Sequence, residues 1–173
     1  LSSNGSLADS VFTRVEIPDK VLLIVITSNR GMCGAFNSSV NKATLEHIHT
    51  NFEVQNKRGD LHIVAIGRKG TEFFTRRNHN VIANYNNIYD NLDYQNVSII
   101  VNLIMDWYKD KTYSRVDIIY NQFKNAATQV LTIEQLLPVI PENKETLQTE
   151  YKNDYIFEPE EEELMAAIIP QLL

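Results

Sequence analysis

The sequence predicts a three-layer α/β domain, with a mostly parallel sheet, one antiparallel edge strand and helices on both faces. The first predicted strand, residues 21–28, begins with six consecutive apolar residues, which suits a strand buried on both faces. Two further apolar segments, 61–66 and 116–120, recur along the chain with helical patterns between them. The 173 residues, 43% of them hydrophobic, suffice for one domain with a real core. Together these observations are typical of a doubly wound, Rossmann-like fold.

A glycine-containing turn follows the first strand and is predicted to lead into a helix. The turn motif consists of Arg30, Gly31, Cys33 and Gly34. The two glycines permit backbone conformations that are closed to other residues, so we expect a tight turn that lets the helix pack closely on its strand. Cys33 has no histidine near it in the sequence, so we expect a small, partly buried hydrophobic residue rather than a catalytic thiol.

The helix after this turn is predicted to start at a polar cap and to pack one face on the sheet. A side-chain oxygen can accept from its first unpaired N–H groups at any of three positions: Asn37, Ser38 or Ser39. The face toward the sheet recurs every four residues: Val40, Thr44, Ile48 and Phe52. His47 and His49 are two residues apart and point to different faces, so both are expected to be solvated or at an edge rather than metal ligands.

The remaining segments continue the alternation of strands and helices. In chain order we expect a helix end at Gly59, a strand at 61–66, a helix from Gly67 to Arg77, a short strand at 81–83, a loop at 84–93, a helix striped by residues 97–108, a strand at 116–123, and an antiparallel strand at 128–133 that ends before Pro138 and Pro141. The domain core therefore spans 21–141. A lead-in segment precedes it at 1–20, and an acidic loop and return segment follows at 142–158. Residues 159–173 are expected to form the start of a truncated C-terminal helix.

Charge and cysteine content exclude several classes of partner and site. The formal charge is −6, and from Glu142 onward nine acidic and two basic residues give −7, which leaves +1 for residues 1–141. No basic stripe is present, so we expect no nucleic-acid partner. A single cysteine cannot form an internal disulfide and fits a reducing compartment. No apolar run is long enough to span a bilayer, and no cluster of metal ligands or catalytic residues stands out in the sequence.

Nucleotide binding is the alternative function that this fold raises. Ligands of doubly wound folds bind at the carboxyl ends of the strands, where residues 29–37 and 67–70 both fall. The glycines are spaced Gly-x-x-Gly, however, and match neither the dinucleotide fingerprint nor the phosphate loop. A small nucleotide-binding enzyme thus remains the rival reading, without the expected fingerprint. A redox protein that uses Cys33 would lack a resolving cysteine.

Five motifs in order resemble the gamma subunit of F-type ATP synthases. They are Thr27-Ser28-Asn29-Arg30-Gly31-Met32-Cys33-Gly34-Ala35-Phe36-Asn37, Gly67-Arg68-Lys69-Gly70, Tyr120-Asn121-Gln122-Phe123, Gln135-Leu136-Leu137-Pro138 and Tyr155-Ile156-Phe157-Glu158-Pro159. The first motif departs from the family in Asn29, where Asp is commoner, and in Met32, where Leu is commoner. Neither change affects the glycines of the turn.

The resemblance implies a mechanical function. Gamma subunits form the central rotor stalk, which couples rotation of the membrane ring to ATP synthesis in the catalytic hexamer, and are not catalytic themselves. No cofactor, metal or small-molecule substrate is therefore expected. The implied partners are the alpha/beta hexamer, the epsilon subunit and the proton-driven c-ring. The implied location is the cytoplasmic face of a bacterial inner membrane, or its organellar equivalent. Neither of the family's long terminal helices is expected in this sequence, so the chain resembles an excised or truncated gamma subunit.

The resemblance also suggests a docking surface near the end of the chain. The segment contains Asp154, Tyr155, Phe157 and Glu158 and matches the family segment that leads into the long C-terminal helix, near the ring and epsilon. Its aromatic side chains alternate with acidic ones, a mixture suited to anchoring an interface. An ordinary contact of these aromatic residues with the domain's own core remains equally open.

Overall fold

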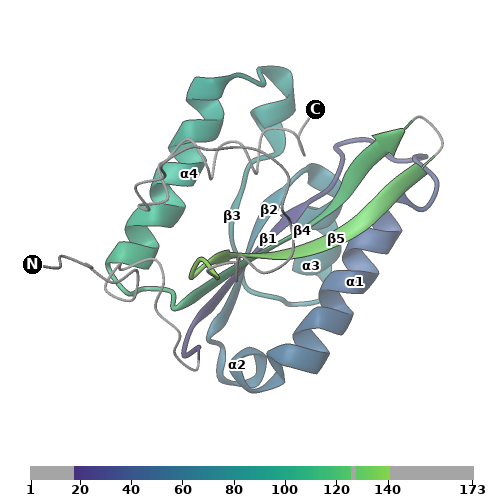
Figure 1. Cartoon of the computed structure of the whole chain (residues 1–173). Helices are drawn as coiled ribbons and strands as arrows, with labels where there is room; N and C mark the ends of the chain where they lie inside the picture. Colours follow the sequence, from purple (N-terminus) through teal and green to yellow (C-terminus); the bar gives the residue numbers. More distant parts are fainter. Residues whose placement is uncertain (1–17, 126–127, 141–173) are drawn as a thin grey trace, which may run out of the picture.

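A single five-stranded sheet forms the centre of the molecule (Figure 1). The computed structural model describes residues 18–125 and 128–140. The strand order is β3-β2-β1-β4-β5, with β5 antiparallel to β4 and the other neighbours parallel. The strands are β1 (Val21–Ile26), β2 (Leu61–Ile66), β3 (Val81–Asn84), β4 (Arg115–Asn125) and β5 (Thr128–Leu137). The predicted mostly parallel sheet with an antiparallel edge is therefore confirmed.

Helices cover both faces of the sheet, which gives the three predicted layers. Figure 1 shows α4 on one side of the sheet and the first three helices on the other. The helices are α1 (Phe36–Asn51), α2 (Glu53–Arg58), α3 (Arg68–Arg76), α4 (Tyr94–Lys109) and the 3-10 helix η3 (Asn86–Asp90). All six residues of β1 are buried and alternate between two hydrophobic clusters. The apolar run at the start of the first predicted strand is thus explained, because β1 has a helix layer on each side.

Several predicted boundaries differ from the observed ones. The strand 61–66 is confirmed over its full length, whereas the strand predicted at 21–28 ends at Ile26. The loop predicted at 84–93 contains the turn of η3, and the edge strand predicted at 128–133 continues to Leu137. The lead-in before residue 18 and the segments after residue 140 lie outside the described residues.

The predicted polar cap of α1 is wrong. Ala35 occupies the N-cap position and makes no side-chain cap. Ser38 and Ser39 lie in the first turn and donate back to the carbonyls of Ala35 and Phe36, at 3.1 and 2.9 Å. Asn37 instead bonds the backbone N–H of Ser28 at 2.9 Å. Polar side chains at a helix start can serve the neighbouring turn as well as the helix, and the sequence pattern does not separate the two uses.

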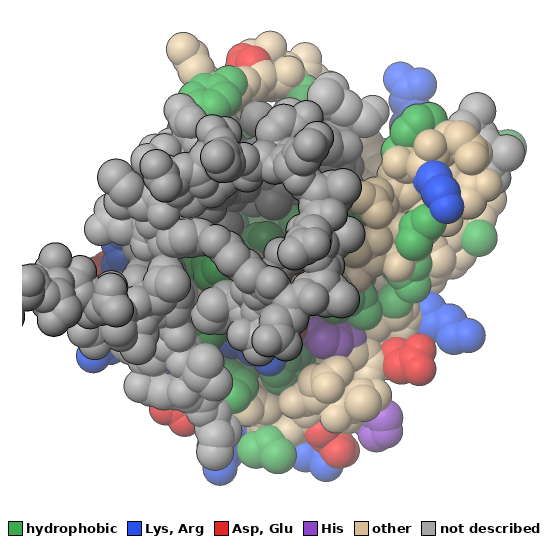
Figure 2. All heavy atoms as spheres, in the orientation of Figure 1, with side chains coloured by type: hydrophobic (Ala, Val, Ile, Leu, Met, Phe, Trp, Pro, Cys, Tyr) green, Lys and Arg blue, Asp and Glu red, His purple; other side chains and the backbone are tan. Residues whose placement is uncertain are grey.

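The outer half of the β4–β5 hairpin is exposed, unlike the rest of the sheet. Phe123 is 67% exposed, and Val130 and Leu131 are each about 40% exposed. Figure 2 shows hydrophobic side chains gathered over this end of the molecule. The inner half of β4, residues 116–121, is buried between the two helix layers, because there β4 pairs with β1, whereas β5 is buried only at Leu136 and Leu137.

A buried charge cluster joins α1 to β4, and it corrects the prediction for His47. Asp117 is fully buried, and its carboxylate accepts from Arg115 Nε and Nη2 at 2.8 and 3.1 Å. His47 Nε2 lies 2.7 Å from Oδ2 of the same carboxylate, and the His47 side chain is only 11% exposed. His49, in contrast, is exposed as predicted. A buried carboxylate requires such partners, so Asp117 fixes the face of α1 that packs on the sheet.

We expect Asp117→Ala to lower the free energy of unfolding by about 1–3 kcal/mol, because it leaves the partly exposed Arg115 and His47 side chains without their acceptor. Urea unfolding followed by circular dichroism measures the change. The matched control is Glu53→Gln, which breaks the exposed ion pair with Lys57 on α2 and should leave the unfolding midpoint unchanged. An Asp117→Ala midpoint equal to that of the wild type would show that the cluster does not hold α1 on β4.

Candidate functional site

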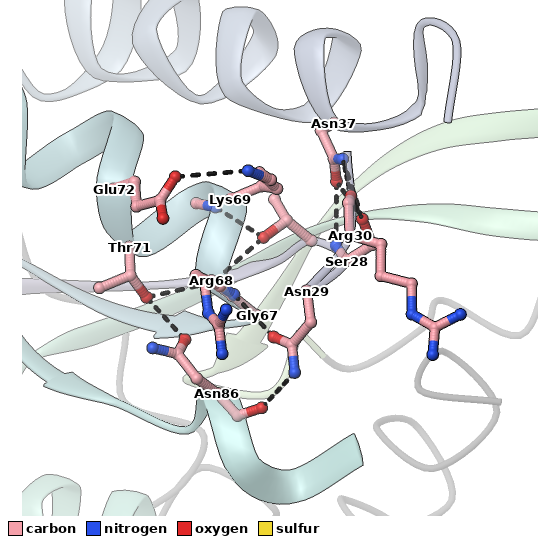
Figure 3. A network of polar contacts seen from close by, with 12 residues as sticks. Ser28, Asn29, Arg30, Asn37, Gly67, Arg68, Lys69, Thr71, Glu72 and Asn86 are labelled. Atoms are coloured by element: carbon pink, nitrogen blue, oxygen red, sulfur yellow. Dashed lines mark hydrogen bonds and ion pairs between the residues drawn. The ribbon is translucent and has the colours of Figure 1, made fainter. Parts of the chain in front are cut away.

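The sites that the sequence singled out meet at the carboxyl ends of β1 and β2 (Figure 3). The turn after β1 carries the predicted motif of Arg30, Gly31, Cys33 and Gly34, and the junction after β2 carries residues 67–70. Because neighbouring parallel strands end at the same edge of the sheet, the turn and the junction lie against each other. This is the edge at which a doubly wound enzyme would bind its ligand, and we call its polar contacts the edge network.

The turn after β1 caps the N-terminus of α3. The N–H of Arg68 donates to Asn29 Oδ1 at 2.8 Å, and the N–H of Lys69 donates to the Ser28 carbonyl at 3.1 Å. The N–H of Gly70 donates to Thr27 Oγ1 at 2.8 Å. The first N–H groups of a helix have no partner within it and can hold a phosphate. At α3 the protein's own chain occupies those donors.

Further bonds connect this cap to η3 on the opposite side of the edge. Asn29 Nδ2 donates to the Asn86 carbonyl at 2.5 Å, and Thr71 Oγ1 donates to Asn86 Oδ1 at 2.9 Å. Tyr89 donates its hydroxyl proton to the Thr27 carbonyl at 2.8 Å. Asn29 is the residue at which the motif departs from the commoner Asp. Its amide accepts from Arg68 and donates to Asn86, whereas a carboxylate could only accept.

Close backbone contact occurs at Gly67 and Gly70 rather than at the glycines predicted to allow it. Gly67 has φ +102, and a Cβ placed there would lie 2.0 Å from the Thr27 carbonyl oxygen. A Cβ on Gly70 would lie 2.9 Å from Thr27 Oγ1. Gly34 has the expected positive φ of +57, but Gly31 does not and has ordinary space around it. The prediction for Gly31 is therefore wrong, because a Cβ there would meet only the flexible Lys69 side chain, at 3.7 Å.

The turn itself is exposed, which corrects the prediction for Cys33. Residues 30–35 are exposed, and the Cys33 thiol meets only backbone carbonyls and the Ser28 hydroxyl. Asn37 holds the base of the turn, since its amide donates to Ser28 Oγ at 2.9 Å. Ser28 Oγ in turn donates to the Arg30 carbonyl at 2.6 Å. The turn therefore keeps a fixed shape without burying its own side chains.

Within residues 18–125 and 128–140, no three His, Cys, Asp or Glu side chains gather as metal ligands, and no helix there is long and apolar enough to cross a membrane. Sequence reasoning missed Asn86 and Tyr89, which lie in a segment without hydrophobic periodicity that could have placed them. The predicted contact residues Asp154, Tyr155, Phe157 and Glu158 lie outside the described residues.

Comparisons with known proteins agree on one family. A family model described as ATP synthase matches residues 1–173. The ATP synthase gamma chain of Flavobacterium johnsoniae is 39% identical over 98% of this chain and 56% of its own length. The gamma chain of Geotalea daltonii is 37% identical over 99% and 58%. The chain thus spans just over half the length of these curated relatives. A chain from the central stalk and c-ring structure of the Tetrahymena thermophila mitochondrial ATP synthase has the same fold, with a TM-score of 0.64 and 21% identity over 92% of this chain and 71% of that one.

We expect Gly67→Ala to lower the free energy of unfolding by about 3 kcal/mol or more, because the new methyl group would overlap the Thr27 carbonyl at a positive φ. Gly34→Ala is the matched control. It has a positive φ but open space around it, so it should cost only about 1 kcal/mol. Chemical denaturation of both variants compares them. Equal losses would mean that backbone conformation alone, and not contact with Thr27, decides the cost.

Tyr89 should make the edge network sensitive to alkaline pH. Burial raises the pKa of Tyr89 to about 12. The unfolded chain loses this proton near pH 10, so the stabilisation is complete below about pH 10 and is lost between about pH 10 and about pH 12. Tyr89→Phe should therefore lower the free energy of unfolding at neutral pH by about 1 kcal/mol. The variant should also lose less stability than the wild type as the pH rises above about pH 10. Urea midpoints on both sides of about pH 10 measure it. An unchanged alkaline slope in the variant would contradict the assignment.

Proposed function

The chain belongs to the ATP synthase family, and on this premise we propose that it forms the foot of the central rotor stalk of a proton-translocating F-type ATP synthase. In this role it is part of a gamma subunit. It passes torque from the rotating membrane ring toward the catalytic hexamer and carries out no chemistry itself. The family match over the whole chain and the two gamma-chain relatives support the proposal.

The observation that carries the proposal is the family match over residues 1–173, and the internal capping of α3 agrees with it. A helix start at this edge of the sheet can hold a phosphate where its N–H groups are free. Here the donors of Arg68, Lys69 and Gly70 are bonded to the turn after β1. A phosphate held at the start of α3 would require that turn to be displaced and these bonds to be broken.

The same contacts suit a part that transmits force. A rotor foot must turn without shearing, so its layers must be fixed to one another. The edge network joins β1, α3 and η3, and the Asp117 cluster joins α1 to β4. Close-packed interiors deform little, and buried polar bonds add directional constraints to that packing. The domain is therefore expected to rotate as one body.

The proposed partners follow from the complex as a whole. They are the alpha/beta hexamer, reached through segments beyond this domain, together with the c-ring and the epsilon subunit. We propose a peripheral location at the cytoplasmic face of a bacterial inner membrane. The relatives from Flavobacterium and Geotalea, both bacteria, support this placement.

A segment exchange tests the function. The segment of the Flavobacterium johnsoniae gamma chain that aligns with this chain is replaced by the present sequence, and ATP-driven proton pumping is measured in inverted membrane vesicles. We expect the exchanged complex to assemble and to pump. The control is the same exchange carrying Gly67→Ala, which should assemble poorly because the domain is destabilised. An exchanged complex that hydrolyses ATP without pumping would contradict the rotor function of this segment.

We also propose that Asp154, Tyr155, Phe157 and Glu158 contact the ring and the epsilon subunit. The alternation of aromatic and acidic side chains supports an interface with a partner that carries basic loops. In a Cys33→Ser background, Tyr155→Cys should form a disulfide on oxidation with a cysteine in the polar loop of the ring subunit. Lys57→Cys, on the exposed helix α2, is the control and should not. A bond at Lys57→Cys alone would mean that the domain is oriented the other way.

A further inference from the structure

A second polar junction lies at the opposite edge of the sheet, where β1 and β4 begin and α4 ends. The Ser114 N–H donates to the Lys20 carbonyl at 3.0 Å, which joins the starts of β1 and β4. The N–H groups of Thr112 and Tyr113 donate to the Trp107 carbonyl at 2.8 and 3.4 Å, which closes the end of α4. We call Lys20, Thr112, Tyr113 and Ser114 the entry junction, because the chain enters β1 and β4 there.

The side chain of Tyr113 ties this junction to His62, near the start of β2. Tyr113 is only 3% exposed, and its hydroxyl oxygen lies 2.6 Å from His62 Nδ1. The Tyr113 ring also meets the rings of His62 and Trp107 edge-on, with centroids 5.5 and 5.7 Å apart. Among the described residues, His62 supplies the one hydrogen bond of this hydroxyl. The tie between the junction and β2 therefore depends on the state of the His62 ring.

The bond between these two side chains can run in either direction, and only one direction satisfies Tyr113. A neutral imidazole has one nitrogen that accepts, so the Tyr113 hydroxyl can donate to Nδ1. A protonated imidazole donates from both nitrogens and accepts at neither. The Tyr113 oxygen must then accept, and its own proton loses its acceptor. Because a buried hydroxyl without a partner is unfavourable, the tie is complete only while His62 is neutral.

The surroundings of His62 favour the neutral ring. Burial lowers the pKa of His62, and the Gly59 carbonyl raises it by less than burial lowers it. Two charged groups of the described chain also act on the ring, and they oppose each other: Lys20 lowers the pKa and Asp60 raises it. The folded state thus binds this proton less readily than the unfolded chain. The resulting stabilisation is complete above about pH 6.5 and is lost as the pH falls from there through the lower pKa of the folded state.

We propose that His62 is an acid-sensitive switch that loosens the entry junction. When its ring gains a proton, the Tyr113 hydroxyl loses its acceptor, and a second positive charge stands beside Lys20, itself part of the junction. The end of α4 and the start of β4 then open more often. The edge network is built without a histidine among its described contacts, so it keeps its bonds. The switch is independent of the proposed rotor function.

The test is native-state amide exchange of the 173-residue chain by NMR, at about pH 7.5 and about pH 5.5, expressed as protection factors. We expect the protection of the Thr112 and Tyr113 N–H groups to fall about fivefold at the lower pH, the loss that one hydrogen bond supplies. The N–H of Gly70, in the edge network, should keep its protection. Nitrogen shifts of the imidazole should show Nδ1 of neutral His62 without a proton. Equal protection at both pH values, or a neutral ring with its proton on Nδ1, would overturn the proposal.

Variants at three positions separate the switch from folding. His62→Gln replaces the titrating ring by an uncharged amide, so protection at Thr112 should no longer depend on pH. Tyr113→Phe removes the hydroxyl and should show the lower protection already at about pH 7.5. His79→Gln is the control, because burial also lowers the pKa of His79, whose ring contacts Phe74 at the end of α3. It should leave the fall at Thr112 unchanged. If His62→Gln retains the pH dependence, if Tyr113→Phe is as protected as the wild type, or if His79→Gln removes the fall, the proposal is wrong.

Discussion

The hydroxyl of Thr27 is the contact on which the carboxyl edge of the sheet depends. It is fully buried, accepts from the N–H of Gly70 at 2.8 Å, and directs its own proton toward the carbonyls of Ile66 and Gly67 at 3.4 and 3.3 Å. One small side chain thus joins the end of β1 to the junction between β2 and α3. The junction can approach so closely only because Gly67 and Gly70 have no Cβ.

This contact also separates the chain from the enzymes that share its architecture. The strand order 3-2-1-4-5 contains the reversal beside β1 at which doubly wound enzymes bind nucleotides. In those enzymes the glycines of the first βα turn leave backbone donors open to a phosphate. Here the glycines at 67 and 70 follow β2 and bring the donors of α3 onto the turn after β1. An architecture of this kind therefore does not by itself assign a nucleotide site.

Much of the fold follows from the sequence, and three of the errors share one cause. The strand at 61–66 was predictable because a continuous apolar run between turn residues suits a strand buried on both faces. Three features were not predictable from the sequence: the exposure of Cys33, the partner of His47 and the open surroundings of Gly31. Each depends on which distant segment lies opposite, and periodicity within one element carries no such information. Gly67 was recognised as part of a motif, but its contact with β1 required the register of the sheet.

Hydrogen exchange at the start of α3 tests the central claim most directly. Native-state exchange of the N–H groups of Arg68, Lys69 and Gly70 is measured by NMR with and without magnesium ATP. Because these donors are bonded to the turn after β1, we expect slow exchange in the free protein and no change when the nucleotide is added. Fast exchange that becomes slow on addition of ATP would show an open phosphate site and would contradict the account.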